Sequence, residues 1–167
     1  RLRAGHAPRV LDLFSGCGGL SLGFRAAGYK IAGAVESDHY AAASHGQNFH
    51  AGEDAHCSPR DMETRPSELA MALGLVPVSR SVDVLIGGPP CQSFSRIGRA
   101  KLRDLRQHPE AFRHDPRARL YLRYLAYVEA FRPLAILIEN VPDVIRFGGQ
   151  NIPEEICEVL ERTGYRG

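Results

Sequence analysis

The chain has 167 residues, of which 44% are hydrophobic and 24% charged, and its formal net charge at pH 7 is +2. This composition is typical of a globular domain and excludes a disordered or fibrous chain, and no apolar run reaches the about 20 residues that a membrane-spanning helix needs. The four cysteines are widely spaced and form no C-x-x-C pair. We therefore expect a soluble, cytoplasmic protein in a reducing setting, with no membrane contact and neither a disulfide framework nor a cysteine-based zinc site.

Charge is distributed unevenly along the chain. Residues 96–123 hold nine basic and three acidic residues, so this segment carries about +6 on a chain whose total is +2. A local basic segment is typical of a docking site for a polyanion. A solvated arginine-rich surface is the alternative interpretation.

The first half of the chain alternates strand and helix. An apolar strand is predicted over residues 10–14, a helix over 20–27, a second strand over 31–35 and a helix over 40–49. Residues 51–65 are polar and are expected to be irregular, and a further helix is predicted over about 67–73.

The second half continues this alternation. A third strand is predicted over residues 82–86, a long loop over 94–118, a helix over 120–131, a fourth strand over 134–138 and a last helix over 152–162. The strands are continuous apolar runs, which indicates strands buried on both faces of a parallel sheet. The fold class is therefore predicted to be α/β, with a mostly parallel sheet and helices on both faces.

The turn after the first strand is rich in glycine. Gly16, Gly18 and Gly19 allow a ligand to approach the backbone and meet helix N–H groups. Glu36 ends the second strand, 17 residues after Gly19, where an acid accepts hydrogen bonds from both ribose hydroxyls. The spacing departs from the G-x-G-x-x-G pattern of NAD sites, which favours a methyl donor. The alternative is a tight packing turn beside an exposed glutamate.

Cys91 stands in a turn framed by glycine and proline, directly after the third strand. Open α/β sheets carry out chemistry beyond the carboxyl ends of their strands, and nearby arginines favour the reactive thiolate. We therefore interpret Cys91 as a nucleophile rather than as a small buried residue.

Glu139 closes the fourth strand, so a parallel sheet would bring it to the same edge as Cys91. A partly buried acid at that edge is suited to giving a proton to a ring nitrogen. The alternative is a carboxylate that caps the next turn or pairs with an arginine.

These motifs together resemble those of the cytosine-C5 DNA methyltransferases, in family order across most of the chain. The longest matches are Asp12-Leu13-Phe14-Ser15-Gly16-Cys17-Gly18-Gly19-Leu20, Gly88-Pro89-Pro90-Cys91-Gln92 and Glu139-Asn140-Val141. Shorter matches are Glu36, Asp61-Met62 and Asp115-x-Arg117-x-x-Leu120. It implies a Rossmann-like, S-adenosylmethionine-dependent methyltransferase fold, incomplete in this chain. The cofactor-binding residues that it implies are Asp12, Phe14, Ser15, Gly16, Gly18, Gly19, Leu20, Glu36, Ser37, Asp61, Met62, Gly88, Pro90 and Leu120. The substrate-binding residues that it implies are Gln92, Ser93, Ser95, Arg96, Asn140 and Val141.

The resemblance also implies a reaction on double-stranded DNA. Cys91 would add to C6 of a flipped-out cytosine, Glu139 would protonate N3, and C5 would take the methyl group of S-adenosylmethionine. The basic segment 96–123 would close over the flipped nucleotide and hold phosphates. We expect the setting to be the cytoplasm of a prokaryotic cell with nucleoid DNA as substrate, a cognate restriction endonuclease in the same system, and a protein that is monomeric when complete.

Three motifs that follow in this family are absent from the sequence, namely a Gln-x-Arg-x-Arg segment, a target-recognition region and the C-terminal motif of the cofactor pocket. Residues 1–167 are therefore expected to be the N-terminal portion of one larger catalytic domain. Cytosine-C5 methylation of tRNA and a non-catalytic, cofactor-binding or regulatory partner remain as alternatives. An exocyclic-amine methyltransferase is disfavoured because Cys91, rather than an aromatic residue, follows the two prolines.

Histidines and a cysteine gather loosely in one segment, at His39, His45, His50, His56 and Cys57. Their intervals match no recognised zinc-ligand pattern. We therefore predict a polar surface helix and loop here, and no metal.

Overall fold

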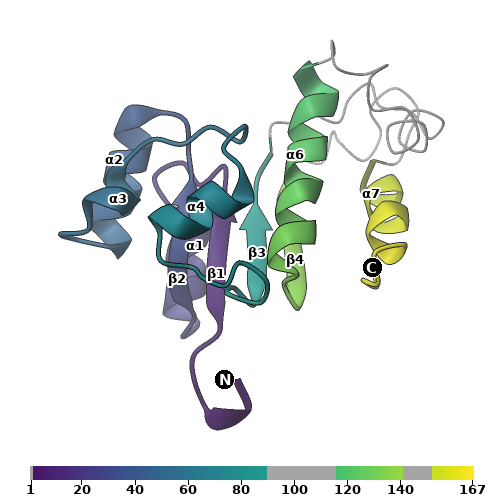
Figure 1. Cartoon of the computed structure of the whole chain (residues 1–167), viewed down its shortest axis with the longest axis horizontal. Coiled ribbons are helices and arrows are strands. Elements are labelled where there is room, and N and C mark those ends of the chain that lie inside the picture. The colour runs from purple at the N-terminus through teal and green to yellow at the C-terminus, as the bar shows by residue number, and fades with distance from the viewer. Residues whose placement is uncertain (1, 90–115, 141–151) are drawn as a thin grey trace. The chain divides into compact units, whose positions relative to one another are not determined.

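The computed structural model describes residues 2–89, 116–140 and 152–167 (Figure 1). The chain divides into two compact units, one of residues 1–88 and 124–139 and the other of residues 89–123 and 140–167. Each unit is described by itself. No helix among the described residues is long and apolar enough to cross a membrane.

The first unit contains a sheet of four parallel strands in the order β2-β1-β3-β4. The strands are β1 (Arg9–Leu13), β2 (Lys30–Val35), β3 (Val84–Gly87) and β4 (Ala135–Ile138). The predicted α/β class and parallel sheet are therefore confirmed, and each strand was placed within two residues. The third strand begins later than predicted, at Val84, and the carboxylate of the preceding Asp83 accepts the backbone N–H of Arg9 at 2.7 Å.

Helices follow the strands as the alternation predicted. They are α1 (Gly19–Ala26), α2 (His39–Phe49), α3 (Asp54–Cys57), α4 (Pro66–Ala72), α6 (Pro116–Phe131) and α7 (Ile152–Glu161), after a short 3-10 turn at Leu2–Ala4. Two expectations were wrong in detail. The polar segment 51–65 contains the short helix α3, and the helix predicted from residue 120 begins at Pro116, a residue type that suits the first turn of a helix because its N–H needs no partner there.

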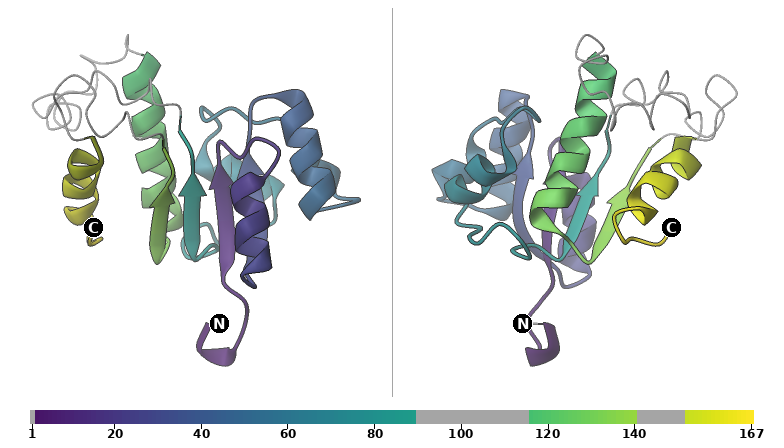
Figure 2. Two further views of the ribbon diagram at one scale, coloured as in Figure 1. Left: turned by 180° about the vertical axis from the view of Figure 1, so that it is seen from behind. Right: turned by 45° about the vertical axis from the view of Figure 1, so that its right-hand side comes forward.

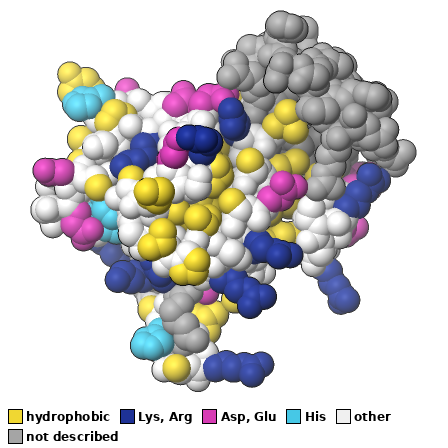
Figure 3. All heavy atoms as spheres, in the orientation of Figure 1, with side chains coloured by type: hydrophobic (Ala, Val, Ile, Leu, Met, Phe, Trp, Pro, Cys, Tyr) yellow, Lys and Arg dark blue, Asp and Glu magenta, His cyan; other side chains and the backbone are white. Residues whose placement is uncertain are grey.

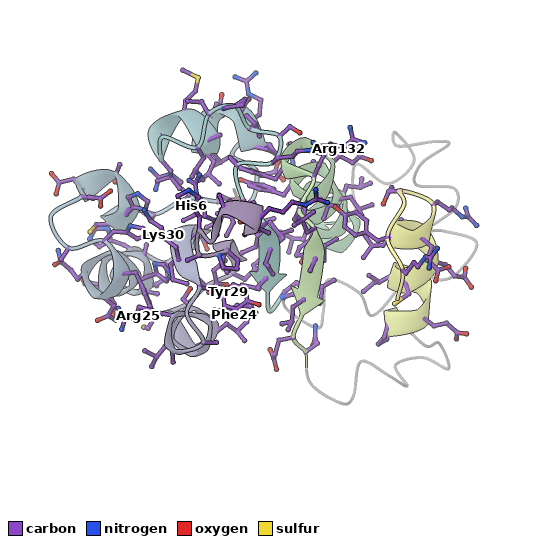
Figure 4. The ribbon with its side chains drawn as sticks, turned by 90° about the horizontal axis from the view of Figure 1, so that it is seen from below. His6, Phe24, Arg25, Tyr29, Lys30 and Arg132 are labelled. Carbon is purple, nitrogen blue, oxygen red and sulfur yellow. The ribbon has the colours of Figure 1, made fainter. Side chains whose placement is uncertain are left out.

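Helices cover both faces of the sheet in the first unit. Figure 1 shows α4 and α6 in front of the strands, and the rear view in Figure 2 shows α1 against the other face. The end of α6 contributes the fully buried rings of Tyr127 and Phe131. On the α1 side, Phe24 and Tyr29 meet edge to face at 5.0 Å and pack on the strand residues of the core, as the view from below in Figure 4 shows.

Strand β4 differs from the expectation of burial on both faces. Its residues alternate between exposed and half-buried, and the side chain of Leu137 is 41% exposed. The strand lies at one edge of the sheet, with β3 as its one paired neighbour among the described strands.

Basic side chains mark the amino-terminal end of the sheet. Figure 4 looks onto this end, where His6, Lys30 and Arg132 are labelled, and Figure 3 shows Lys and Arg side chains along the lower part of one face. The candidate site described next lies at the opposite, carboxyl end of the strands.

Candidate active site

The carboxyl ends of the four strands lie in register. Leu13 of β1 pairs with Val35 of β2 on one side and with Gly87 of β3 on the other, and Gly87 pairs with Ile138 of β4. The residues that follow these four positions therefore leave the sheet along one edge. The sequence predicted this convergence, because the strands are parallel and the candidate residues come directly after them.

The turn after β1 has a strained backbone. Phe14 adopts a left-handed conformation with φ 59°, which is rare for a residue with a bulky side chain. The N–H groups of Phe14 and Ser15 both donate to the carbonyl of Val35, at 2.9 and 3.3 Å. These bonds hold the turn against the end of β2, and strain of this kind is concentrated at functional sites.

Gly16 and Gly18 have left-handed backbones but different surroundings. A Cβ on Gly18 would lie 2.4 Å from Phe49 Cε2, so this glycine is required for packing against α2. A Cβ on Gly16 would meet nothing within 4 Å, and neither would one on Gly19. The turn therefore has open space above Gly16 and Gly19, where the predicted ligand would lie. Leu20 follows at the start of α1, half-buried against the core.

Both carboxylate oxygens of Glu36 accept backbone hydrogen bonds. Oε2 accepts the N–H of Gly16 at 2.9 Å, and Oε1 accepts the N–H of Asp38 at 2.8 Å. Asp38 in turn caps α2 by accepting the N–H of Ala41 at 2.8 Å. Glu36 therefore fixes the glycine turn and the start of α2 while each oxygen keeps a further lone pair for a ligand.

The segment that contains Asp61 and Met62 returns to the same strand end. The N–H of Arg60 donates to the carbonyl of Glu36 at 2.7 Å. Asp61 is exposed and accepts the N–H of Glu63 at 2.7 Å, whereas Met62 is 4% exposed and belongs to the core. Ser37, beside Glu36, is exposed. Asp61 and Ser37 can thus meet a ligand directly, while Met62 supports the loop from below.

Asp12 lies inside the protein, beneath the glycine turn. It is fully buried, and its Oδ2 accepts the hydroxyl of Ser21 at 2.7 Å. The Ser21 oxygen also lies 3.0 Å from Nε2 of His45, which is buried. This places Asp12 as a support of the turn rather than as a surface ligand.

Burial controls the protonation of this network. It raises the pKa of Asp12 to about 6, against the opposing effect of the Ser21 hydrogen bond. It lowers the pKa of His45 to about 4, and the nearby His50 and His56 add to this effect. With these pKa values, His45 is neutral and Asp12 is ionised near pH 7. The His45 Nε2–H then donates to the Ser21 hydroxyl, which donates to the Asp12 carboxylate.

Gly88 and Glu139 are in contact at the ends of β3 and β4. The N–H of Glu139 donates to the carbonyl of Gly87 at 2.9 Å, which continues the strand pairing. A Cβ on Gly88 would lie 3.0 Å from Oε2 of Glu139, closer than most real contacts. Glu139 is exposed, so the partial burial expected for it is not found.

In the second unit, Asn140 Nδ2 donates to the carbonyl of Pro89 at 2.9 Å. This bond joins the segment after Glu139 to the segment that leads to Cys91. Leu120 lies half-buried in the first part of α6. The remaining predicted site residues lie outside the described residues, and these are Pro90, Cys91, Gln92, Ser93, Ser95, Arg96 and Val141. Most of the basic segment 96–123 lies there as well.

Sequence reasoning missed Ser21, and its prediction of a polar surface helix was wrong for His45, which is 1% exposed. A signal was present, because a serine beside the apolar residues Leu20 and Phe24 at the start of a helix needs a polar partner when buried. Its partner could not be identified, since Asp12 and His45 lie 9 and 24 residues away in the chain.

A family model described as C-5 cytosine-specific DNA methylase matches residues 8–167. The protein named "Putative type II methyltransferase M.OihORF3336P" from Oceanobacillus iheyensis is 39% identical over 159 residues, which cover 95% of this chain and 34% of the relative. Type II methyltransferase M.AgeI from Thalassovita gelatinovora is 38% identical, with 94% of this chain and 33% of the relative covered. The chain therefore spans about a third of the length of these curated relatives.

Two solved structures share the fold. The crystal structure of a "putative DNA modification methyltransferase" encoded within an E. coli prophage has a TM-score of 0.64 and 30% identity, covering 93% of this chain and 38% of that one. The S. pombe Dnmt2 methyltransferase has a TM-score of 0.61 and 22% identity, covering 96% and 42%, and this likeness concerns the fold alone.

Proposed function

The chain belongs to the C-5 cytosine-specific DNA methylase family, and from that membership we propose that it transfers a methyl group from S-adenosylmethionine to C5 of a cytosine flipped out of double-stranded DNA. The observation that carries the proposal is that the carboxyl ends of the four parallel strands lie in register. In-register pairing of Val35, Leu13, Gly87 and Ile138 brings the glycine turn, Glu36, Gly88 and Glu139 to one edge.

The glycine turn and Glu36 fit S-adenosylmethionine. The open space above Gly16 and Gly19 suits a ligand that lies against the backbone, and the spare lone pairs of Glu36 suit the two ribose hydroxyls. Ser37 and Asp61, both exposed, would border the adenine. Asp12 and Met62 would act from beneath by holding the turn and the loop.

Chain length supports a place for Cys91 near Glu139. Cys91 follows Gly88 by three residues, so its Cα lies within about 11 Å of the Gly88 Cα in any conformation. Gly88 in turn contacts the Glu139 carboxylate. A cytosine ring between these two side chains would have the Cys91 sulfur near C6 and the Glu139 carboxyl group near N3.

The proposed chemistry overcomes the low reactivity of cytosine C5. The Cys91 thiolate forms a bond to C6, Glu139 delivers a proton to N3, and the C5–C6 electron pair becomes available at C5. S-adenosylmethionine supplies a methyl group on a positively charged sulfur, and C5 takes it. A base then removes the C5 proton, the C5–C6 double bond re-forms, the thiolate departs and the N3 proton returns to Glu139.

The basic segment 96–123 supports DNA as the substrate. Its charge of about +6 suits phosphates, whose neutralisation provides most of the sequence-independent affinity for DNA. We propose cytoplasmic action on prokaryotic DNA, with a restriction endonuclease of the same system as functional counterpart, since the named relatives are type II methyltransferases. We also propose that residues 1–167 form the first part of a monomeric enzyme's catalytic domain.

The decisive experiment is covalent trapping on 5-fluorocytosine. Fluorine at C5 takes the place of the proton that a base must remove before the thiolate can leave. A base cannot remove fluorine in this way, so the Cys91–C6 bond persists after methyl transfer. Full-length protein is incubated with S-adenosylmethionine and 5-fluorocytosine DNA, beside a Cys91→Ser variant and a tRNA substituted in the same way. An adduct on DNA that resists denaturation and requires Cys91 supports the proposal. An adduct on tRNA alone moves the substrate to RNA, and no adduct on either favours the non-catalytic alternative.

A further inference from the structure

A second cluster of chemically capable side chains lies away from the strand ends, where α2 meets α3. His50 directly follows α2 as its C-cap residue, Glu53 precedes α3, and His56 lies within α3. The two imidazoles are buried, with 9% and 7% of their side chains exposed, whereas Glu53 is 63% exposed. Figure 3 shows His and acidic side chains together at the edge of the first unit occupied by α2 and α3.

The three side chains converge closely. His50 Nδ1 lies 3.9 Å from Glu53 Oε1, and His56 Nε2 lies 3.3 Å from Glu53 Oε2. The two rings stack with centroids 3.6 Å apart, and the candidate ligand atoms all lie within 4.8 Å of one another. Two ligand atoms of a tetrahedral zinc ion are about 3.3 Å apart. The widest pair of ligand atoms therefore needs to close by about 1.5 Å, with a turn of one ring so that both nitrogens face the ion.

The backbone holds the cluster in place before any ion arrives. The N–H of His50 donates to Gly46, that of Glu53 to His50, and that of His56 to Glu53, at 2.7, 3.0 and 2.9 Å. These hydrogen bonds close successive backbone turns, so His50, Glu53 and His56 follow one another one turn apart. A Cβ on Gly46 would lie 2.5 Å from Cys57 Sγ, so a glycine there lets α3 pack tightly on α2.

Burial also disfavours protonation of the two imidazoles. Burial lowers the pKa of His50 to about 4, with a further lowering from His56. Burial also lowers the pKa of His56, against the opposing charge of Glu53. Both rings are thus neutral near pH 7. In addition, Nε2 of His50 is buried and has no hydrogen-bond partner among the described residues.

We propose that His50, Glu53 and His56 bind one divalent transition-metal ion of the zinc class, which clips α2 to α3. Two imidazoles and one carboxylate are a recurrent zinc ligand set, and the exposed position of Glu53 leaves a fourth ligand to water. Cys57 is not part of the set, because its sulfur faces the side-chain amide of Gln47 at 3.8 Å. The charges of Lys30 and Arg60 oppose a cation here, which lowers the affinity we expect.

The role of this ion is structural. The segment from α3 onward leads to Arg60, whose N–H bonds to the carbonyl of Glu36. An ion at the α2–α3 junction would therefore stabilise the loop that borders the proposed cofactor site without contacting it.

The test is metal binding by the full-length protein after removal of metals with a chelator. Zn²⁺ is titrated against a colorimetric competitor, Co²⁺ is followed by its visible absorption, and the melting temperature is measured with and without Zn²⁺. We expect one equivalent of Zn²⁺, tetrahedral Co²⁺ bands and a higher melting temperature. Glu53→Gln and His56→Gln should each weaken binding at least about tenfold.

His39→Gln is the matched control, because His39 is an exposed histidine on the same helix. It should leave Zn²⁺ affinity unchanged. Since Glu53 is mostly exposed, Glu53→Gln should keep the melting temperature of the metal-free protein, which separates lost ligation from lost folding. Equal affinity in all variants, or no binding by the unsubstituted protein, would overturn the proposal.

Discussion

The backbone N–H of Gly16 donates to Oε2 of Glu36 across 2.9 Å, and this bond joins the turn after β1 to the end of β2. The other oxygen of Glu36 accepts the N–H of Asp38, which caps α2. One carboxylate thus fixes three elements at the edge where the ligand is proposed to lie. Effects of substitutions at Glu36 should therefore appear in both stability and ligand affinity.

Replacement of Glu36 by Gln tests this double role. The amide keeps the volume but places an NH₂ group against one of two backbone donors, so one hydrogen bond is lost and the ribose hydroxyls lose a charged acceptor. We expect the Kd for S-adenosylmethionine to rise at least about tenfold and the free energy of unfolding to fall by about 1–2 kcal/mol. Calorimetric titration and urea unfolding measure the two effects. Glu161→Gln, at an exposed carboxylate on α7, should change neither.

Alanine at Gly18 should mainly lower stability, whereas alanine at Gly16 should mainly lower ligand affinity. Gly18→Ala would place a methyl group 2.4 Å from Phe49 at a φ of 99°, so it should destabilise the protein by about 2–4 kcal/mol. Gly16→Ala has open space, so it should cost only about 1 kcal/mol of backbone strain. Its methyl group would instead occupy the ligand's position and raise the Kd more than about tenfold.

Gly23→Ala on α1 provides the control for these glycines, because a Cβ there meets nothing and the helix backbone accepts alanine. It should be neutral or slightly stabilising and leave ligand affinity unchanged. If Gly16→Ala bound S-adenosylmethionine normally, the ligand would not lie against this turn.

Ser21→Ala should change how stability depends on pH. The pKa of Asp12 is 3.8 in a model peptide and about 6 in the folded protein, so folding binds a proton between these values and stability falls as pH rises through them. His45 has the opposite effect over about pH 4–6.5, because its folded pKa of about 4 lies below its ordinary value. The two slopes therefore largely cancel in the unsubstituted protein.

Loss of the Ser21 hydroxyl removes the hydrogen bond that lowers the pKa of Asp12, so this pKa should rise further. The difference in unfolding free energy between variant and unsubstituted protein should then grow as pH rises from 6 to 8, to about 1.5–3 kcal/mol. Urea unfolding at pH 5, 6, 7 and 8 in the presence of chelator measures it. A difference that stays constant with pH would mean that Ser21 does not stabilise the ionised carboxylate.

Glu139→Gln should slow methyl transfer while leaving the fold intact, since Glu139 is exposed. The amide cannot deliver a proton to N3, so we expect a loss of about a hundredfold or more in single-turnover rate. Gly88→Ala should also slow the reaction, because its methyl group would press within 3.0 Å of the Glu139 carboxylate and displace it. An unchanged rate in Glu139→Gln would assign the acid to another residue.

Asn140→Ala removes the donor that holds the Pro89 carbonyl at 2.9 Å. The segment leading to Cys91 would lose one anchor, so we expect a lower kcat with no change in the Kd for S-adenosylmethionine. Formation of the 5-fluorocytosine adduct, followed in time, should slow in parallel. Equal losses in kcat and cofactor affinity would instead indicate a general disturbance of the fold.

The strands, the glycine turn and the order of the site residues could be predicted from sequence because each depends on local pattern. Apolar runs of four to six residues form β1, β2 and β3, and glycine at Gly16 and Gly18 meets a local need for positive φ. Parallel pairing then follows from the alternation of strands and helices, and it places Gly88 and Glu139 at one edge. The predicted burial of β4 was wrong, since an apolar run does not reveal how far other elements cover a strand.

Only the tertiary structure decided which polar side chains meet. Asp12, Ser21 and His45 come from a strand and two helices, and their hydrogen bonds depend on how those helices pack on the sheet. The convergence of His50, Glu53 and His56 depends on the backbone turns that link α2 to α3, and the intervals between these residues match no recognised zinc-ligand pattern. Local sequence determines backbone conformation and the edge to which residues are delivered, whereas contacts between distant side chains depend on packing, which is a property of the whole fold.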